Sequence, residues 1–301
     1  MPTPSPSRPA AFRKPRLLIV GCGDIGERVL RQLGSRYRVT ALTSQPARTS
    51  TLRRAGARPL LGNLDRPPTL GRLGALATRV LHLAPPPAAG TDDTRTAALL
   101  RALARGGSVR QIVYASTSGV YGDAGGARFD ETRAVAPATD RAQRRVDAER
   151  RLRWYGRAFG VGVSLLRIPG IYAADRPGGA PRERVERGTP LLRDADDVYT
   201  NHVHADDLAR TCIAALHRGR PQRAVHVSDD TEMKMGDYFD LVADLAGLAR
   251  APRIARDEAR ERLTPMTLSF MSESRRLVNR RLKAELRVAL RYPTVREGLR
   301  A

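Results

Sequence analysis

A glycine-rich hexapeptide near the start of the chain has the spacing that phosphate-binding turns use. In GCGDIG, the glycines Gly21, Gly23 and Gly26 follow the apolar run RLLIV and precede a helical pattern. The first glycine permits a sharp turn, the second lets backbone approach a pyrophosphate, and the third lets a helix pack closely on a strand. Other tight turns also contain this spacing, but the helix that follows supplies amide donors and a favourable dipole. The motif in this context predicts a dinucleotide-binding turn.

The residues after the next apolar run indicate which dinucleotide would bind. An acid at this position would hold a ribose 2′-hydroxyl, whereas a 2′-phosphate needs hydroxyls and cations. The sequence here is ALTSQPAR, with Thr43 and Ser44 in place of an acid and Arg48 close behind. This favours NADP over NAD, although Arg48 also fits the role of one more surface arginine.

A strongly basic segment, TDRAQRRVDAERRL, begins at Thr139. Its apolar residues recur at helical spacing, which predicts an amphipathic helix with most of its charges facing outward. Three interpretations of the charges compete: a solvent face braced by ion pairs, a nucleic-acid surface, or part of a reaction centre.

The overall charge does not decide between these interpretations. The 301 residues carry a formal net charge of +22, with 50 arginines and only three lysines. The arginines are spread along the whole chain, which indicates a general compositional bias more than a nucleic-acid surface. Recognition of an anionic ligand in one cleft is the other alternative.

The remaining composition favours a cytoplasmic protein without a metal centre. Cys22 and Cys212 lie far apart and outside any metal or redox spacing, so we expect reduced thiols and no metal. Residues 1–15 are rich in Pro, Ser and basic residues and read as a disordered leader, without the apolar core of a signal peptide. No apolar run reaches membrane-spanning length.

Short apolar runs alternate with helical patterns from Arg16 onward. Strands are expected near residues 16–20, 37–43, 57–61, 79–84 and 109–116, with helical patterns at 25–33 and 92–107. Such alternation predicts crossover units and a parallel sheet covered on both faces. We expect residues 16–170 to form a dinucleotide-binding domain. Residues 171–301 should form a substrate lobe, including the strand RAVHVS, with parts that return to the first domain.

Three further motifs carry a resemblance to a known family. IVYASTSGVYGD, LLRIPGIYAADR and NHVHADDLA follow GCGDIG in order, and over residues 16–250 the chain resembles the extended short-chain dehydrogenases/reductases. These are NAD(P)-dependent epimerases and dehydratases acting on nucleotide sugars. The tail from Ser272 to Leu299 resembles an atypical bacterial subgroup, the YeeZ-like proteins. The resemblance implies an α/β, doubly wound parallel-sheet Rossmann fold with a small C-terminal α/β substrate lobe.

The resemblance also implies the cofactor contacts. It places the glycine turn at the pyrophosphate, a segment after the third strand near the adenine, and a segment after the fourth strand along the cofactor. The cofactor-binding residues expected on this basis are Gly21, Gly23, Asp24, Ile25, Gly26, Asn63, Leu64, Leu83, Ala84, Pro85, Ser116, Ile168 and Pro169.

The catalytic positions depart from the family pattern. Thr117 falls at the family's catalytic Ser/Thr, where it would donate to a substrate oxygen, although it can also cap its loop. Counting back from Glu149, Arg141 and Arg145 occupy the positions of the family's Tyr-x-x-x-Lys pair. Arginine stays protonated and cannot exchange a proton. Arg145 can still hold ribose hydroxyls, and Arg141 can bind an anionic or carbonyl group.

Other residues could supply the missing proton donor or bind the substrate. Tyr121, Tyr172, His82, His202 and His204 can exchange protons, but each has a packing role as an alternative; the histidines of NHVHADDLA are expected to order a loop. The expected substrate-binding residues are Tyr172, Arg176, Asn201, Arg275 and Arg276. The arginines among them suit phosphate or carboxylate.

Three functions remain open at this stage. The first is an oxidoreductase, epimerase or dehydratase with a displaced proton donor, acting on an anionic small molecule. The second is a non-catalytic NAD(P) sensor or scaffold, which the missing tyrosine favours. The third, supported by charge alone, is a nucleic-acid-binding protein. A homodimer is compatible with each of them.

Overall fold

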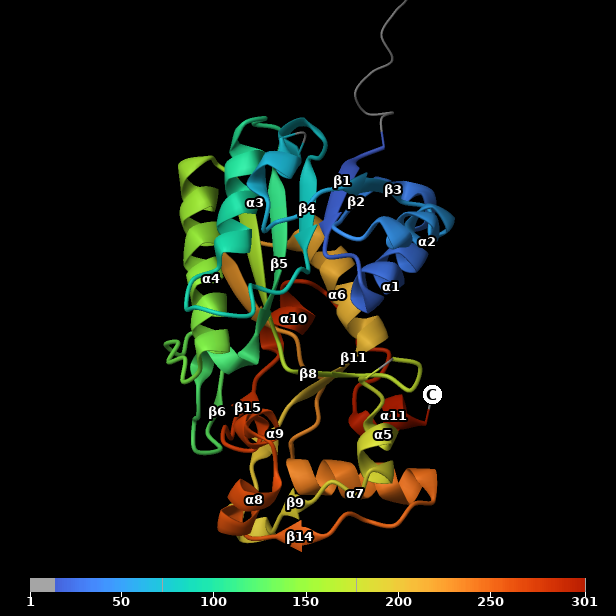
Figure 1. Cartoon of the computed structure of the whole chain (residues 1–301), viewed down its shortest axis with the longest axis vertical. Helices are drawn as coiled ribbons and strands as arrows, with labels where there is room; N and C mark the ends of the chain where they lie inside the picture. Colours follow the sequence, from blue (N-terminus) through green and yellow to red (C-terminus); the bar gives the residue numbers. More distant parts are fainter. Residues whose placement is uncertain (1–13, 72, 177, 301) are drawn as a thin grey trace, which may run out of the picture.

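The computed structural model describes residues 14–71, 73–176 and 178–300, so most of the expected leader lies outside the described residues. Seven parallel strands form the central sheet in the order β12-β7-β5-β4-β1-β2-β3 (Figure 1). Their bounds are β1 Arg16–Val20, β2 Arg38–Thr43, β3 Arg58–Leu61, β4 Arg79–His82, β5 Gln111–Thr117, β7 Gly162–Ile168 and β12 Arg223–His226.

The strands are continuous apolar runs because both faces of the sheet are covered. In β1, every residue from Leu17 to Val20 is buried, as expected for a parallel strand between two helical layers. The chain builds β2 and β3 on one side of β1 and then crosses to β4 and β5 on the other. This reversal leaves a crevice beyond the carboxyl ends of β1 and β4, where doubly wound sheets bind ligands.

Helices cover the two faces of the sheet in separate layers. One core lies between the sheet and α1 (Asp24–Leu33) together with α6 (Ala205–Arg218). The other lies between the sheet and α3 (Thr94–Ala104) together with α4 (Asp140–Ala158). The short α2 (Thr49–Arg54) links β2 to β3. The predicted doubly wound Rossmann fold is therefore confirmed.

A smaller lobe lies beyond the carboxyl ends of the strands (Figure 1). Its helices are α5 (Pro181–Glu186), α7 (Met235–Ala246), α8 (Arg256–Arg262), α9 (Pro265–Phe270) and α11 (Val295–Leu299). The short α10 (Arg280–Ala284) instead packs against β12, and its Leu282 joins the core that contains α1 and α6. Four two-stranded ladders complete the lobe: β6 (Arg128–Phe129) with β15 (Arg276–Leu277), β8 (Gly170–Tyr172) with β11 (His202–His204), β9 (Leu191–Leu192) with β14 (Arg253–Ile254), and β10 (Tyr199–Thr200) with β13 (Met233–Lys234).

Two segments differ from the expectation for the lobe. RAVHVS forms β12, which pairs with β7 at the edge of the central sheet instead of joining the lobe. The segment from His202 to His204 is a buried strand, β11, and not a loop, because it pairs in parallel with β8. No helix among the described residues is both long and apolar enough to cross a bilayer.

The basic segment forms α4, but three of its charged residues are buried, contrary to the expected outward orientation. Arg144 donates to the carbonyl of Gly90, and Asp147 accepts the amide of Asp93 at 2.9 Å. Glu149 is the third buried charge. These contacts tie α4 to the loop after β4 and to the sheet, so its inner face is polar as well as apolar.

Candidate functional site

The glycine turn between β1 and α1 is closely packed at two of its glycines and open at the third. A Cβ added to Gly21, where φ is +82°, would lie 2.5 Å from the amide nitrogen of Ala84. At Gly26 it would lie 2.8 Å from the sulfur of Cys22. At Gly23 it would meet nothing within 4 Å. The open space above Gly23 is where backbone can approach a pyrophosphate.

A cleft of about 410 Å³ lies beyond the carboxyl ends of β1 to β4. It brings together nine of the expected cofactor-binding residues: Gly21, Gly23, Thr43, Ser44, Arg48, Asn63, Leu64, Ala84 and Pro85. Among the other expected residues, Pro169 lines the second cavity described below. Asp24, Ile25, Gly26, Leu83, Ser116 and Ile168 line neither space.

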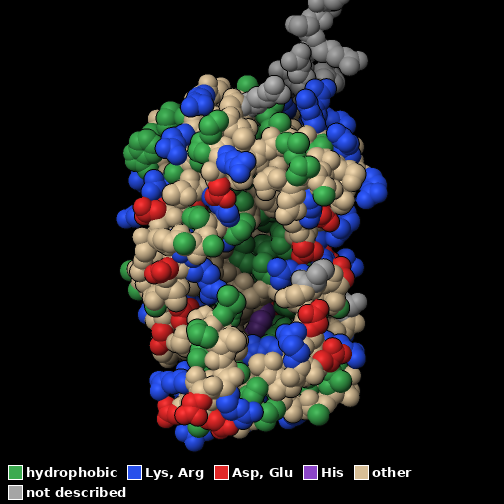
Figure 2. All heavy atoms as spheres, in the orientation of Figure 1, with side chains coloured by type: hydrophobic (Ala, Val, Ile, Leu, Met, Phe, Trp, Pro, Cys, Tyr) green, Lys and Arg blue, Asp and Glu red, His purple; other side chains and the backbone are tan. Residues whose placement is uncertain are grey.

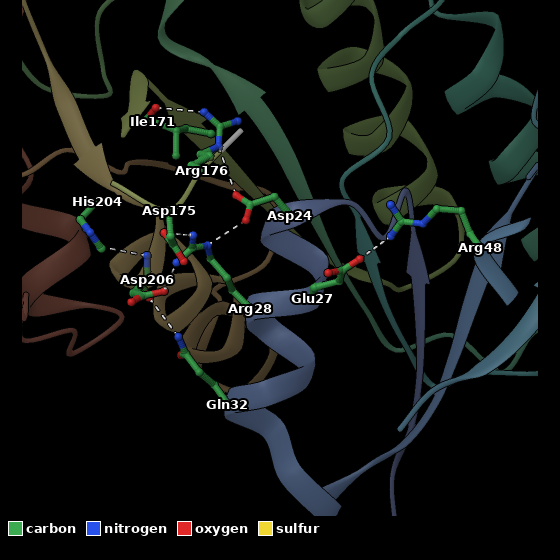
Figure 3. A network of polar contacts seen from close by, with 10 residues as sticks. All are labelled: Asp24, Glu27, Arg28, Gln32, Arg48, Ile171, Asp175, Arg176, His204 and Asp206. Carbon is green, nitrogen blue, oxygen red and sulfur yellow. Dashed lines mark hydrogen bonds and ion pairs between the residues drawn. The ribbon is translucent and has the colours of Figure 1, made fainter. Parts of the chain in front are cut away.

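Arg48 reaches the rim of this cleft but already has partners there. Its Nη2 donates to Oε1 of Glu27 at 2.5 Å (Figure 3). The same Nη2 donates to the carbonyl of Cys22 at 2.7 Å. The Ser44 side chain beside it is exposed. Arg48 is therefore held at the mouth of the cleft by an acid on α1.

Arg95 also lines the cleft, although its position in the sequence did not indicate it. Its guanidinium holds the carboxylate of Asp65 through two hydrogen bonds of 2.7 Å. Arg95 also donates to the carbonyl of Pro85 at 3.2 Å. The acidic side chain at this end of the cleft is thus neutralised by a paired cation.

Asp24, expected at the cofactor, belongs instead to a network centred on Arg28 (Figure 3). Its carboxylate contacts Nε of Arg28 at 3.0 Å and Nε of Arg176 at 3.1 Å. The buried Arg28 also binds Asp175 and, at 2.6 Å, Asp206. Burial alone would lower the pKa of Arg28, but the hydrogen bonds that it donates to the three carboxylates outweigh burial and raise the pKa. Arg176, expected at the substrate, therefore anchors α1 to the lobe.

A second cavity of about 390 Å³ lies between the sheet and the lobe. Figure 2 shows the molecule hollowed at this level, with a histidine side chain at the floor of the hollow. The expected residues that line the cavity are Thr117, Arg141, Pro169, Tyr172, Asn201 and Arg275. Residues that line it without having been expected there include Arg184, Tyr199, Tyr238, Phe239 and Phe270.

Thr117 stands at the end of β5 and lines this cavity. Its hydroxyl accepts the amide of Gly119 at 3.2 Å, so it also caps the short turn that follows. The hydroxyl of Ser116, by contrast, points inward and donates to Glu149 at 2.6 Å. Thr117 thus has the loop-capping contact that was one alternative and also faces the space that a substrate would need.

The two arginines at the Tyr-x-x-x-Lys positions lie in different surroundings. Arg145 donates to the carbonyl of Ala115 at 2.6 Å and to the hydroxyl of Tyr114 at 3.0 Å, which turns it toward the sheet. Arg141 is exposed at the cavity, with its guanidinium 4.7 Å from the ring centroid of Phe270. Neither group can exchange a proton near neutral pH.

Tyr121 and Arg276 lie outside the cavity lining. The Tyr121 hydroxyl is 2.6 Å from Nε2 of His226 and accepts from Arg167 at 2.6 Å. Burial raises the pKa of Tyr121 to about 12, so the catalytic role considered for it does not fit this position. Arg276 donates to the carbonyl of Gly126 at 2.8 Å and stacks on Tyr199, which directs it away from the cavity.

His202 lines the floor of the cavity and is almost fully buried. Its ring stacks on Tyr238 with centroids 4.0 Å apart, and its Nδ1 has no partner among the described residues. Burial lowers the pKa of His202 to about 3, so the imidazole is neutral at pH 7. His204, by contrast, caps α6 by accepting the amide of Asp206 at 3.2 Å.

The glycine turn at the switch point of the parallel sheet, and the cavity between the sheet and the second lobe, define a doubly wound α/β protein with two separate spaces at the carboxyl ends of its strands. The sequence profile of the NAD dependent epimerase/dehydratase family matches residues 17–228. The chain therefore belongs to this family, and the predicted resemblance is confirmed.

Solved structures agree with this assignment. A functionally unknown conserved protein from Silicibacter pomeroyi DSS is 31% identical, with 95% of this chain and 97% of that chain covered and a TM-score of 0.80. A double mutant of the dTDP-glucose 4,6-dehydratase DesIV from Streptomyces venezuelae, with NAD and DAU bound, is 20% identical (coverage 95% and 96%, TM-score 0.76). The UDP-glucose 4-epimerase of Thermotoga maritima, with UDP-glucose, is also 20% identical (94% and 96%, TM-score 0.76). The last two likenesses show the fold alone. No curated protein sequence matched the chain significantly.

Proposed function

We propose that this protein is an NAD(P)-dependent oxidoreductase, epimerase or dehydratase acting on an anionic hydroxyl or carbonyl compound, with nucleotide-linked sugars as one class of candidate. The observation that carries the proposal is the pair of spaces: a backbone-lined cleft beyond β1 to β4, and a side-chain-lined cavity that begins at Thr117 on β5. A bound nicotinamide would supply hydride exchange.

The cleft fits a dinucleotide, with NADP preferred over NAD. The open backbone at Gly23 suits the pyrophosphate. Thr43 and Ser44 line the rim with Arg48, where hydroxyls and a cation would meet a 2′-phosphate. Glu27, an acid near this rim, is paired with Arg48 and reduces the positive charge that Arg48 offers to a 2′-phosphate. The proposed preference for NADP is therefore modest.

The chain's own residues would divide the work in the cavity. Thr117 presents a hydroxyl that can donate to a substrate oxygen, and Arg141 presents a charge that can polarise a carbonyl. Tyr172, Asn201 and Arg275 line the cavity as substrate contacts. Proton exchange would fall to a residue other than the two arginines of α4.

A second candidate is a non-catalytic NAD(P) sensor or scaffold. The contacts of Arg145 favour it: its guanidinium is bound to Ala115 and Tyr114, a structural role that needs no reaction. A nucleic-acid partner receives less support, because basic side chains are scattered among acidic ones on the face in Figure 2.

We also retain a homodimer and a cytoplasmic location as proposals. Trp154 and Phe159 on and after α4 are 61% and 51% exposed, and large exposed apolar side chains on one helix suit a subunit contact. Both described cysteines are unpaired thiols, which suits a reducing compartment.

Titration calorimetry with NADP and NAD tests the cofactor, and turnover assays on anionic hydroxyl and carbonyl compounds then test the reaction. Binding with NADP preferred, followed by turnover of at least one such compound, is the expected result. Binding without any turnover would favour the sensor. Failure to bind either dinucleotide would overturn both proposals.

A further inference from the structure

Among the arginines that line the cavity, Arg184 alone has guanidinium nitrogens that are buried without a hydrogen-bond partner in the described part of the chain. Arg184 lies on α5 and lines the cavity, with its guanidinium 4.4 Å from the ring centroid of Phe239. Its Nε and Nη2 are buried and have no hydrogen-bond partner among the described residues. No carboxylate in the described part of the chain lies within ion-pair distance of Arg184.

Two of the arginines that the sequence indicated as anion ligands already have partners. Arg275 is paired with Glu273 at 2.7 Å and donates to the carbonyl of Gly122 at 2.8 Å. Arg176 is paired with Asp24. The positive charge that remains for a ligand includes the exposed Arg141 on α4 and, on the α5 side, Arg184, whose buried nitrogens have no partner among the described residues.

The two partnerless nitrogens make Arg184 suited to one kind of ligand. Nε and Nη2 form one edge of the guanidinium, and their parallel N–H groups match the two oxygens of a carboxylate or phosphate. A buried guanidinium without a partner is unfavourable, and an anion removes that cost. Burial and then the neighbouring Arg187 lower the pKa of Arg184 to about 10, which still leaves it charged at pH 7.

We propose that Arg184 is the receptor for an anionic group of the substrate, a carboxylate or a phosphate, on the α5 wall of the cavity. The inference rests on the proposed function in taking this cavity as the substrate site. Because the two partnerless nitrogens are buried beside Phe239, the proposal requires a rotation of the Arg184 side chain that turns this edge toward the cavity.

This position orients the substrate across the cavity. Thr117 enters from the carboxyl end of β5, and α5 belongs to the lobe on the other side (Figure 1). A substrate with its anion on Arg184 directs its opposite end toward Thr117 and the dinucleotide cleft. The substrate class is therefore a small molecule with the reacting hydroxyl or carbonyl remote from its anionic group.

Anion titrations of three variants test the proposal. Arg184→Gln removes the charge, Arg184→Lys keeps it without the two-nitrogen edge, and Arg182→Gln is the matched control. Arg182 lies on the same helix but is exposed and paired with Glu186 at 2.7 Å. Inorganic phosphate and succinate are titrated by calorimetry, with and without saturating NADP, and thermal unfolding is followed alongside.

We expect the parent to bind at least one of the two anions and Arg184→Gln to weaken that binding tenfold or more. Arg184→Lys should lie between them, and Arg182→Gln should stay within twofold of the parent. Binding of phosphate alone identifies a phosphoryl group, and binding of succinate alone identifies a carboxylate. Without any anion, Arg184→Gln should unfold at a higher temperature than the parent, because an unpaired buried charge is gone.

Parent-like anion binding by Arg184→Gln would overturn the proposal, as would a parent that binds neither anion. NADP titration of the same proteins separates this outcome from a failure of the proposed function. A parent that binds no dinucleotide defeats the proposed function, whereas a parent that binds NADP but shows no dependence on Arg184 defeats only this inference.

Discussion

The cleft at the glycine turn, our proposed dinucleotide site, and the cavity at Thr117, our proposed substrate site, are built by opposite means. The cleft is shaped by backbone: a glycine turn, strand ends, and a few side chains that are paired with one another, such as Arg95 with Asp65. The cavity is shaped by side chains from segments far apart in the sequence, and some of them lack partners, as His202 and Arg184 do. Among the described residues, no buried side-chain polar atom of the cleft lacks a partner, whereas the cavity contains buried side-chain atoms that a ligand could pair with.

This difference indicates which features the protein should share with its relatives and which should be its own. A backbone cleft places the same demands on every chain that binds a pyrophosphate, so it changes little between relatives. A side-chain cavity can be altered residue by residue without disturbing the sheet. Specificity in this protein should therefore reside in the lobe, and the following experiments address that division.

The largest effect should come from Gly23→Asp in the cleft. The new carboxylate would occupy the space required by the pyrophosphate and repel it, so dinucleotide binding should be abolished. The fold should survive, because a Cβ at Gly23 meets nothing within 4 Å. Calorimetry with NADP checks the binding and circular dichroism checks the fold, with the exposed Gly71→Asp as control. Parent-like NADP affinity in a folded Gly23→Asp protein would show that the cleft is not the dinucleotide site.

Thr117→Ala tests the boundary between the two spaces. If Thr117 donates to a substrate oxygen, its removal should lower turnover by about a hundredfold while NADP binding changes little. Ser118→Ala, one residue along in the same cavity lining, should cost less. Steady-state rates on the best substrate decide the matter, and unchanged turnover would remove Thr117 from the reaction.

His202→Phe tests whether the buried histidine at the cavity floor makes the fold less stable at acid pH. The folded-state pKa of about 3 lies below the ordinary value of 6.5, so protonation favours unfolding. The stability linked to His202 is complete above pH 6.5 and falls as the pH drops toward 3, with about 2 kcal/mol lost at pH 5. Phenylalanine keeps the stack on Tyr238 but cannot be protonated. In His202→Phe the free energy of unfolding, measured in urea, should therefore depend less on pH below 6.5. The exposed His217→Phe should alter this pH dependence less, and parallel curves for parent and His202→Phe would contradict the argument.

Arg48→Ala should produce the smallest change, which should be seen in the ratio of the affinities for NADP and NAD. Loss of one charge-assisted contact costs about 1 to 2 kcal/mol, so NADP should bind about tenfold more weakly while NAD is nearly unaffected. Arg54→Ala removes an exposed arginine from the adjoining α2 and serves as control. Equal affinities of the parent for NADP and NAD would remove the basis of the preference.

Local signals in the sequence were sufficient for the fold and for much of the cleft. The glycine turn and the apolar runs each depend on neighbouring residues, so Gly21 and Gly23 could be placed in advance, whereas Asn63 was placed by the family resemblance. The edge strand β12 was assigned to the lobe because four apolar-rich residues do not reveal which sheet they join.

The cavity was less predictable because its chemistry depends on distant partners. Arg176 and Arg184 look alike in the sequence, yet one is neutralised by Asp24 and the other is not. Partners 150 residues away leave no local trace in an arginine-rich chain. Burial of Arg144 on α4 was missed for the same reason, since its acceptor is a backbone carbonyl in a separate loop.

The Arg28 network has a consequence for exchanging parts between relatives. The cation comes from α1, whereas Asp175 and Asp206 come from the part of the chain that follows residue 170. Consider a chimaera that takes residues 171–301 from a relative in which neither position 175 nor position 206 is an acid. The buried guanidinium of Arg28 would then keep only Asp24 of its three carboxylate partners. The two halves are thus not independent modules, and a successful graft must transfer this charge pattern along with the lobe.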